Sequence, residues 1–77
     1  MIVEIYGAKW CNFCKNAVSL CEAKAIEYKY IDIDDTENMR LLQERIVTRV
    51  KTVPQIFVDG EYIKGGYTGL VHHLSKP

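Results

Sequence analysis

The sequence predicts a small α/β domain with a four-stranded mixed sheet and three helices, in the order βαβαββα. Apolar runs with the period of a strand alternate with segments in which apolar residues recur every three or four positions, as in a helix. Near the C-terminus, Asp59-Gly60 is a strong hairpin signal, so part of the sheet should be antiparallel. A chain of 77 residues has room for one core, and residues 1–77 are therefore predicted to form a single domain.

The first half of the chain predicts a strand, a helix and a second strand. Ile2–Tyr6 is rich in β-branched and aromatic side chains, and Gly7 ends this strand. From Cys14 onward, apolar residues recur on one helical face. They are Cys14, Ala17, Val18, Cys21 and Ala25. Tyr28–Asp34 alternates with a period of two and predicts a strand parallel to the first, because a helix connects the two.

A second helix should follow the second strand. Asp35 or Thr36 is expected to cap its start, because short polar side chains accept the free N–H groups there. The helix is predicted to run to about Val47. The apolar residues that share its face are Met39, Leu42 and Ile46.

The rest of the chain predicts a hairpin and a short last helix. Pro54–Val58 and Glu61–Lys64 are its two strands, and Gly65-Gly66 ends the second of them. Thr68 can cap the last helix. The side chains expected to point from this helix toward the core are Leu70, Val71 and Leu74.

Two cysteines, Cys11 and Cys14, lie at the junction of the first strand and the first helix. Cys11 should lie at the first helical turn, where unpaired N–H groups and the positive end of the helix dipole favour a negative atom. Lys9 and Lys15 add positive charge, so we expect Cys11 to be ionised in neutral solution and to be the attacking nucleophile. Cys14, one turn deeper on the packed face, is then expected to be the resolving thiol.

Thiol–disulfide exchange explains this cysteine pair better than stabilisation does, because a disulfide that closes so small a ring constrains the unfolded chain little. A local structural bridge and half of a metal site are the alternatives. A zinc site needs two further ligands, and Cys21, His72 and His73 lack a second partner at ligand spacing, so no metal is predicted. Cys21 lies on the apolar helix face and is expected to pack in the core.

The composition excludes several classes of function. The content of 48% hydrophobic and 26% charged residues is globular, and no run approaches the about eighteen apolar residues of a membrane span. Ten basic and ten acidic residues cancel, so we expect no nucleic-acid partner. Strand-like sequence follows Met1 without an export signal, and three cysteines, an odd number, suit a reducing compartment, which predicts a cytoplasmic location.

Three motifs, in this order and spacing, resemble the dithiol glutaredoxins. They are Cys11-Asn12-Phe13-Cys14, Thr52–Val58 and Gly65-Gly66-Tyr67-Thr68. The resemblance covers nearly the whole chain and implies a thioredoxin-like fold. It implies a glutathione-dependent oxidoreductase that reduces protein disulfides and glutathione mixed disulfides, with glutathione as co-substrate. The implied partners are glutathione and disulfide-containing or glutathionylated proteins, ribonucleotide reductase being one candidate, and we expect a monomer because nothing in the sequence favours dimerisation.

The same resemblance implies a glutathione site. Val53-Pro54 would be a cis peptide beside Cys11, which exposes the Val53 backbone to the extended backbone of glutathione. Glycines and N–H groups at the start of the last helix would hold the γ-glutamyl carboxylate. The implied binding residues are Lys9, Phe13, Thr52, Val53, Pro54, Gly66, Tyr67 and Thr68.

The chain departs from the family pattern at Ala8, where a basic residue is frequent, and at Gly69, where an aspartate is frequent. Lys9 is expected to substitute for the first, and Arg49 and Lys51 suit the glycyl carboxylate of glutathione. Two other functions remain open. One is a redoxin reduced by a flavoprotein thioredoxin reductase, and the other is a carrier of an iron–sulfur cluster held by cysteine and glutathione from two protomers.

Overall fold

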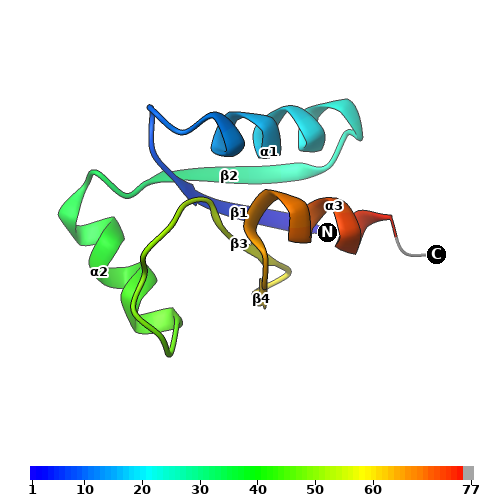
Figure 1. Cartoon of the computed structure of the whole chain (residues 1–77). Helices are drawn as coiled ribbons and strands as arrows, with labels where there is room; N and C mark the ends of the chain where they lie inside the picture. The colour runs from blue at the N-terminus through cyan, green and yellow to red at the C-terminus, as the bar shows by residue number, and fades with distance from the viewer. Residues whose placement is uncertain (76–77) are drawn as a thin grey trace.

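The computed structural model describes residues 1–75, which form one four-stranded sheet with three helices (Figure 1). The elements in chain order are β1 (Ile2–Gly7), α1 (Asn12–Ala23), β2 (Glu27–Asp32), α2 (Thr36–Arg45), β3 (Gln55–Val58), β4 (Glu61–Ile63) and α3 (Gly66–Leu74). The strand order across the sheet is β2-β1-β3-β4. β1 pairs with β2 in parallel, whereas the β1–β3 and β3–β4 pairs are antiparallel. The predicted mixed sheet and element order are confirmed.

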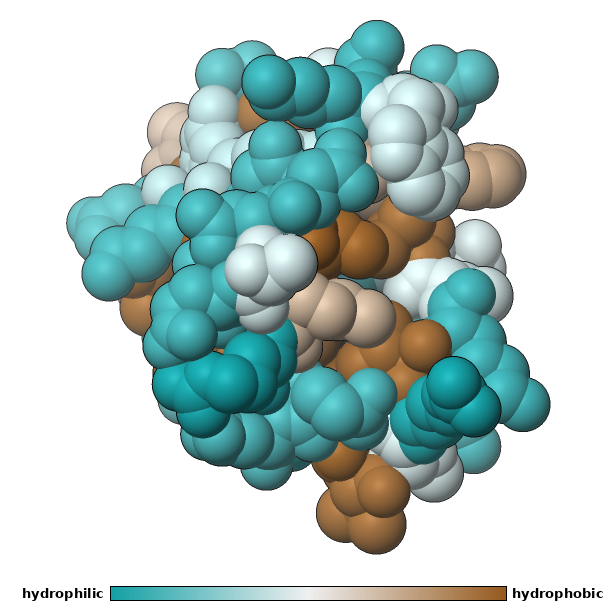
Figure 2. Space-filling model, turned by 90° about the vertical axis from the view of Figure 1, so that its left-hand side faces the viewer, coloured by the Kyte–Doolittle hydropathy of each residue, from teal (hydrophilic) through white to brown (hydrophobic). Residues whose placement is uncertain are grey.

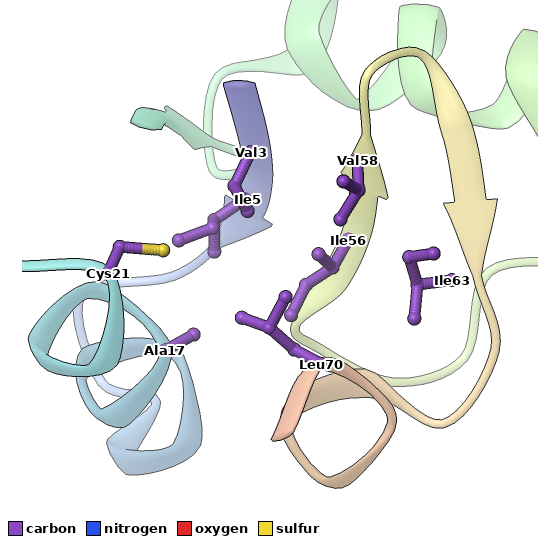
Figure 3. Packing of buried hydrophobic residues seen from close by; sticks show 8 residues of the cluster. All are labelled: Val3, Ile5, Ala17, Cys21, Ile56, Val58, Ile63 and Leu70. Carbon is purple, nitrogen blue, oxygen red and sulfur yellow. The ribbon is translucent and has the colours of Figure 1, made fainter. Parts of the chain in front are cut away.

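The larger part of the core lies between the sheet and helices α1 and α3. Its buried side chains, shown in Figure 3, are Val3, Ile5, Ala17, Cys21, Ile56, Val58, Ile63 and Leu70. They come from β1, β3, β4 and both helices, so α1 and α3 pack against the same face of the sheet. The sequence-based expectation that Cys21 packs in the core is confirmed.

Helix α2 covers the opposite face of the sheet from α1 (Figure 1), where a smaller cluster is built on Tyr6, Leu42 and Phe57. Arg45, the last residue of α2, places its guanidinium 3.7 Å from the centre of the Phe57 ring. The same guanidinium donates hydrogen bonds to the Glu4 carboxylate at 2.9 and 3.2 Å. The end of α2 is therefore held on the sheet by a cation–π contact and an ion pair.

The strand bounds differ from the prediction by one or two residues, and two of the differences have a clear local cause. The second strand ends at Asp32 instead of Asp34, because the Asp32 carboxylate accepts the Asp34 N–H at 2.9 Å and turns the chain. The third strand begins at Gln55 instead of Pro54, which has no N–H to donate to the ladder. The hairpin turn after this strand is as predicted, since Asp59-Gly60 has φ values of 51 and 84.

The last helix begins earlier than predicted, and two assignments of its residues are corrected. Its N-cap is Gly65, whose φ of 100 is left-handed, and Thr68 lies inside the helix, so the expectation that Thr68 caps it is wrong. Leu70 is fully buried as predicted, whereas Val71 is 36% exposed and does not face the core. Val71 lies about 100° around the helix from Leu70, so it points away from the core face on which Leu70 lies.

The second helix is shorter than predicted but is capped as expected. The Asp35 carboxylate accepts the N–H groups of the second and third helical residues, at 2.9 and 3.2 Å. The helix ends at Arg45 instead of Val47, because Ile46 is extended.

The first helix also ends before its predicted last apolar residue. Ala25, predicted on the face of this helix, lies beyond the end of α1 with a φ of 54°.

Candidate active site

Cys11 is the N-cap of α1, in an extended conformation with φ −94 and ψ 112. Its sulfur accepts the N–H of Cys14 at 3.2 Å, as the oxygen of a capping serine would. The N–H of Cys11 itself donates to the carbonyl of Ala8 at 3.1 Å and closes the loop after β1. Cys11 therefore holds its sulfur at the N-terminus of α1, where the helix presents its unpaired N–H groups.

Cys14 lies within the first turn of α1 and is completely buried, whereas Cys11 is 6% exposed. Burial, together with the side chain of Cys11, raises the pKa of the Cys14 thiol to about 11. A hydrogen bond from the Ala8 backbone and the hydroxyl of Tyr30 act in the opposite direction. In the reduced protein, Cys14 is therefore a protonated thiol at neutral pH.

The turn before β3 brings backbone next to the capping sulfur. Val53-Pro54 is a cis peptide bond, as the resemblance implied. The Cys11 thiol donates to the Val53 carbonyl at 3.7 Å. The amide of Gln55 holds the same turn, because its nitrogen donates to the Thr52 carbonyl at 2.8 Å and to the Thr52 hydroxyl at 3.3 Å.

A tyrosine of β4 orients this glutamine. The Tyr62 hydroxyl donates to Oε1 of Gln55 at 2.6 Å, and the Tyr62 ring packs against Phe57 with the ring centres 5.4 Å apart. Sequence reasoning did not assign Gln55 and Tyr62 to the site. A signal was available, because the Asp59-Gly60 turn pairs Phe57 with Tyr62, and Gln55 shares the sheet face of Phe57.

A cleft with a cavity of about 270 Å³ runs from the first turn of α1 to the start of α3. Its lining residues are Phe13, Thr52, Val53, Pro54, Gln55, Tyr62, Gly65, Gly66, Tyr67 and Thr68. Three segments that are far apart in the sequence meet here. The cleft brings together seven of the eight predicted binding residues, since only Lys9 is missing from its lining.

Two features of the cleft differ from the family pattern. Lys9 lies on the other side of the Cys11 loop, in a separate cavity that it shares with Lys15 and Tyr30. At Gly69, a Cβ atom would lie 2.0 Å from the carbonyl oxygen of Lys64. The backbone of this chain therefore has no space for an aspartate at position 69 unless the start of α3 moves.

A second groove lies beside Cys11 and is walled by Trp10, which is 70% exposed. Its cavity of about 440 Å³ is lined by Trp10, Cys11, Asn12, Phe13, Lys51, Thr52 and Val53. A smaller cavity continues from Trp10 to Ile33, Met39 and Val50. Figure 2 views the molecule from the side of α2 and shows apolar side chains gathered in the middle of this face, bordered by hydrophilic ones.

The segments around Cys11 carry an excess of positive charge, although the formal net charge of the whole chain is zero. Residues 5–21 and 46–58, which frame the sulfur, contain four basic residues and no acidic one. The basic residues are Lys9, Lys15, Arg49 and Lys51. Such a local excess of positive charge attracts anionic ligands.

Within residues 1–75, no three His, Cys, Asp or Glu side chains are grouped so that they could hold a metal ion. The three cysteines are free thiols in this structure. None of the described helices is long and apolar enough to cross a membrane.

The two thiols of the pair should differ in their reaction with an alkylating agent. Only a thiolate is alkylated, and at about pH 8 a thiol with a pKa of about 11 is ionised to roughly one part in a thousand. Iodoacetamide is therefore expected to label Cys11 rapidly and Cys14 only as the pH approaches the pKa of Cys14. Peptide mass spectrometry of samples quenched over time measures both rates. Equal labelling of the two cysteines at about pH 8 would contradict the assignment.

A thiol that caps a helix, with a second thiol buried one turn behind it, is arranged for thiol–disulfide exchange. The sheet order and the cis-proline turn beside the outer sulfur belong to the thioredoxin-like fold. The molecule is thus a thiol–disulfide oxidoreductase of that fold.

Comparison with known proteins gives the family. The family model for glutaredoxin matches residues 3–63, and the chain belongs to the glutaredoxin family. It is 40% identical over 74 residues to glutaredoxin 1 of Escherichia coli, covering 88% of this chain and 86% of that protein. The solved structure of reduced Escherichia coli glutaredoxin superposes with a TM-score of 0.79 at 35% identity, over 96% of this chain and 93% of that one.

A buckwheat glutaredoxin–glutathione complex shares the fold. Its TM-score is 0.73 at 23% identity, and the match covers 94% of this chain and 66% of the buckwheat chain.

Proposed function

We propose that the protein uses glutathione to reduce protein disulfides and glutathione mixed disulfides through Cys11 and Cys14. The observation that carries the proposal is the cleft, which opens beside the capping sulfur and is lined by three separate segments of the chain. Its volume of about 270 Å³ and its exposed backbone suit part of a short extended peptide such as glutathione.

The cleft offers a partner for each part of glutathione. The backbone of Val53 would pair with the cysteinyl residue, as in strand addition, and align its sulfur with Cys11. The N–H groups of Gly66, Tyr67 and Thr68 at the start of α3 would hold the γ-glutamyl carboxylate. Lys51, exposed beside Thr52, would meet the glycyl carboxylate.

The walls of the cleft are aromatic. The rings of Phe13 and Tyr67 both line it, with their centres 6.2 Å apart and their planes tilted by 31°. Phe13 is 60% exposed and supplies an apolar wall for the ligand without a hydroxyl. A bound glutathione complex of the same fold, that of buckwheat glutaredoxin, also supports glutathione as the ligand.

In the dithiol route, the Cys11 thiolate attacks one sulfur of a protein disulfide, and the other sulfur leaves as a thiolate that takes up a proton. Cys14 then attacks Cys11, which releases the reduced protein and leaves a Cys11–Cys14 disulfide. Two glutathione molecules reduce this disulfide and become oxidised glutathione. In the monothiol route, Cys11 takes the glutathionyl group from a glutathionylated protein, and a second glutathione removes it as oxidised glutathione.

The polypeptide part of the substrate is proposed to lie in the second groove, on the Trp10 side of Cys11. The groove continues over apolar side chains and is bordered by Lys51, so it suits an extended segment with an apolar residue near its reactive cysteine. Ribonucleotide reductase is one candidate substrate. We also propose that the protein acts as a monomer in the cytoplasm, where a reducing environment keeps the thiols ready between cycles.

The experiment that tests this function is steady-state turnover of a glutathionylated peptide, with glutathione, glutathione reductase and NADPH. We expect turnover that saturates with glutathionylated peptide and fails when a flavoprotein thioredoxin reductase replaces the glutathione couple. Activity with thioredoxin reductase alone would instead favour a redoxin that takes its electrons from this flavoprotein. Visible absorbance after anaerobic reconstitution with iron and sulfide would favour a cluster carrier.

A further inference from the structure

A tyrosine of the edge strand is anchored to the loop that carries Cys11. Tyr30 lies on β2, and its hydroxyl donates to the carbonyl of Ala8 at 2.9 Å. The same carbonyl accepts the N–H of Cys11 at 3.1 Å. The hydroxyl is part-buried, so its position is defined by this contact and not by solvent.

The absence of a side chain at Gly7 lets this hydroxyl approach the buried thiol. A Cβ atom on Gly7 would lie 2.7 Å from the sulfur of Cys14 and 2.7 Å from the hydroxyl oxygen of Tyr30. Two atoms that flank one position this closely occupy the same small space between β1, β2 and α1. Tyr30 is therefore beside Cys14, although 15 residues separate the two in the sequence.

The pKa of Tyr30 determines whether its hydroxyl can donate a hydrogen bond to the sulfur of Cys14. Burial and the neighbouring Cys14 raise the pKa of Tyr30 to about 12, and Cys11 and Asp32 act in the same direction. The hydroxyl therefore keeps its proton at neutral pH and is a donor. Lys9 and Lys15 line the cavity on the open side of the Tyr30 ring and face the same region with positive charge.

We propose that Tyr30 is a positioning residue for the resolving step, in which its hydroxyl donates a hydrogen bond to the thiolate of Cys14 and so sets how fast Cys14 resolves a mixed disulfide on Cys11. The inference adds a residue role to the proposed function. It rests on that function in one respect, which is that glutathione competes with Cys14 for the mixed disulfide on Cys11. The backbone of Ala8 also lowers the pKa of Cys14.

The step is an ordinary thiol–disulfide exchange. Cys14 loses its proton to solvent, and its thiolate attacks the sulfur of Cys11. The bond between Cys11 and the substrate sulfur breaks, and the substrate leaves as a thiolate with the electron pair. During the attack the Tyr30 hydroxyl turns from the Ala8 carbonyl to the Cys14 sulfur, and no proton leaves the tyrosine.

The size of the effect follows from how exchange rates depend on acidity. If loss of the hydroxyl raises the pKa of Cys14 by one unit, the thiolate fraction falls tenfold. The nucleophilicity of the remaining thiolate rises about threefold, for a Brønsted coefficient of about 0.4 to 0.5. At neutral pH, the attack of Cys14 on the mixed disulfide should therefore slow about threefold for each unit by which the pKa of Cys14 rises.

The test uses an aromatic disulfide, a dimer of nitrothiobenzoate, in a stopped-flow instrument. Cys11 attacks the reagent in a first phase whose rate depends on reagent concentration, and Cys14 then expels the second coloured thiolate in a phase that does not. We expect Tyr30→Phe to slow the second phase about threefold or more and to shift its pH inflection upward, with the first phase unchanged. The first phase reports whether the loop and Cys11 are intact.

Tyr28→Phe is the matched control. Tyr28 lies on the same strand and lines the same cavity as Tyr30, but its hydroxyl donates to Glu22 at 2.9 Å, away from the cysteines. Both phases should be unchanged in this variant. An unchanged second phase in Tyr30→Phe, or an equal slowing of both phases, would overturn the proposal. Because the assay contains no glutathione, its result is independent of whether glutathione is the reductant.

Discussion

Replacing Cys11 with serine is expected to abolish turnover of protein disulfides and of glutathione mixed disulfides alike. A serine hydroxyl still accepts the N–H of Cys14 and caps α1, so the fold should survive. It cannot form a disulfide with a substrate, however, and the remaining Cys14 is completely buried, so burial still raises its pKa and keeps it unreactive. Turnover in the glutathione reductase couple measures the loss, and circular dichroism checks that the variant is folded.

Cys14→Ser is the matched variant for this experiment. It should keep turnover of glutathionylated peptides, because the monothiol route uses only Cys11, and it should lose most turnover of protein disulfides. Equal loss of both activities in the two variants would contradict the division of roles between the thiols. Retained activity in Cys11→Ser would show that another group is the nucleophile.

Replacing Leu70 with alanine is expected to have the largest effect on stability. Leu70 is completely buried in α3 and packs against β3 and β4 in the larger core cluster (Figure 3). Truncating a buried leucine leaves a cavity and lowers the free energy of unfolding by about 3 kcal/mol. Small domains are stable by only about 5 to 15 kcal/mol in total, so this is a large share. Urea denaturation followed by circular dichroism measures it.

Leu70 also connects the core to the cleft. The helix that it holds on the sheet begins with Gly66, Tyr67 and Thr68, which line the cleft. A loosened α3 should therefore raise the KM for a glutathionylated peptide as well. Val71→Ala is the control on the next residue, which is exposed, and it should change the free energy of unfolding by less than about 0.5 kcal/mol. Similar losses in both variants would show that α3 is packed differently.

The sequence was sufficient for the features that depend on local chemistry. The alternation of apolar residues, the Asp59-Gly60 turn and the aspartate cap of α2 are set by neighbours within a few residues, and the structure has all of them. The start of α3 was predicted incorrectly for the same reason. Thr68 is a good local cap, but the left-handed conformation of Gly65 starts the helix earlier, and the residue-type preference gave no sign of this.

In the candidate site, the sequence predicted the motifs but not the contacts that side chains make across the sheet. Motifs in the sequence predicted the lining of the cleft, because each motif contributes a turn or a helix start. The roles of Tyr62 and Tyr30 depend on contacts across the sheet: one reaches Gln55 from the next strand, and the other reaches the Ala8 carbonyl from the parallel strand. Lys9 was placed with the ligand from its sequence distance to Cys11, but the loop turns it to the other side.

A sulfur used as a helix cap makes the first turn of α1 sensitive to the redox state. In the reduced protein, the sulfur of Cys11 accepts the Cys14 amide at 3.2 Å and holds the helix start closed. Once the sulfur is bonded to a substrate or to Cys14, the amide keeps only a weaker acceptor, because a disulfide sulfur is a poorer acceptor than a free one. Each catalytic cycle should therefore weaken and then restore the hydrogen bond that closes the first turn of α1. The hydrogen-exchange rate of the Cys14 amide would report the redox state of Cys11.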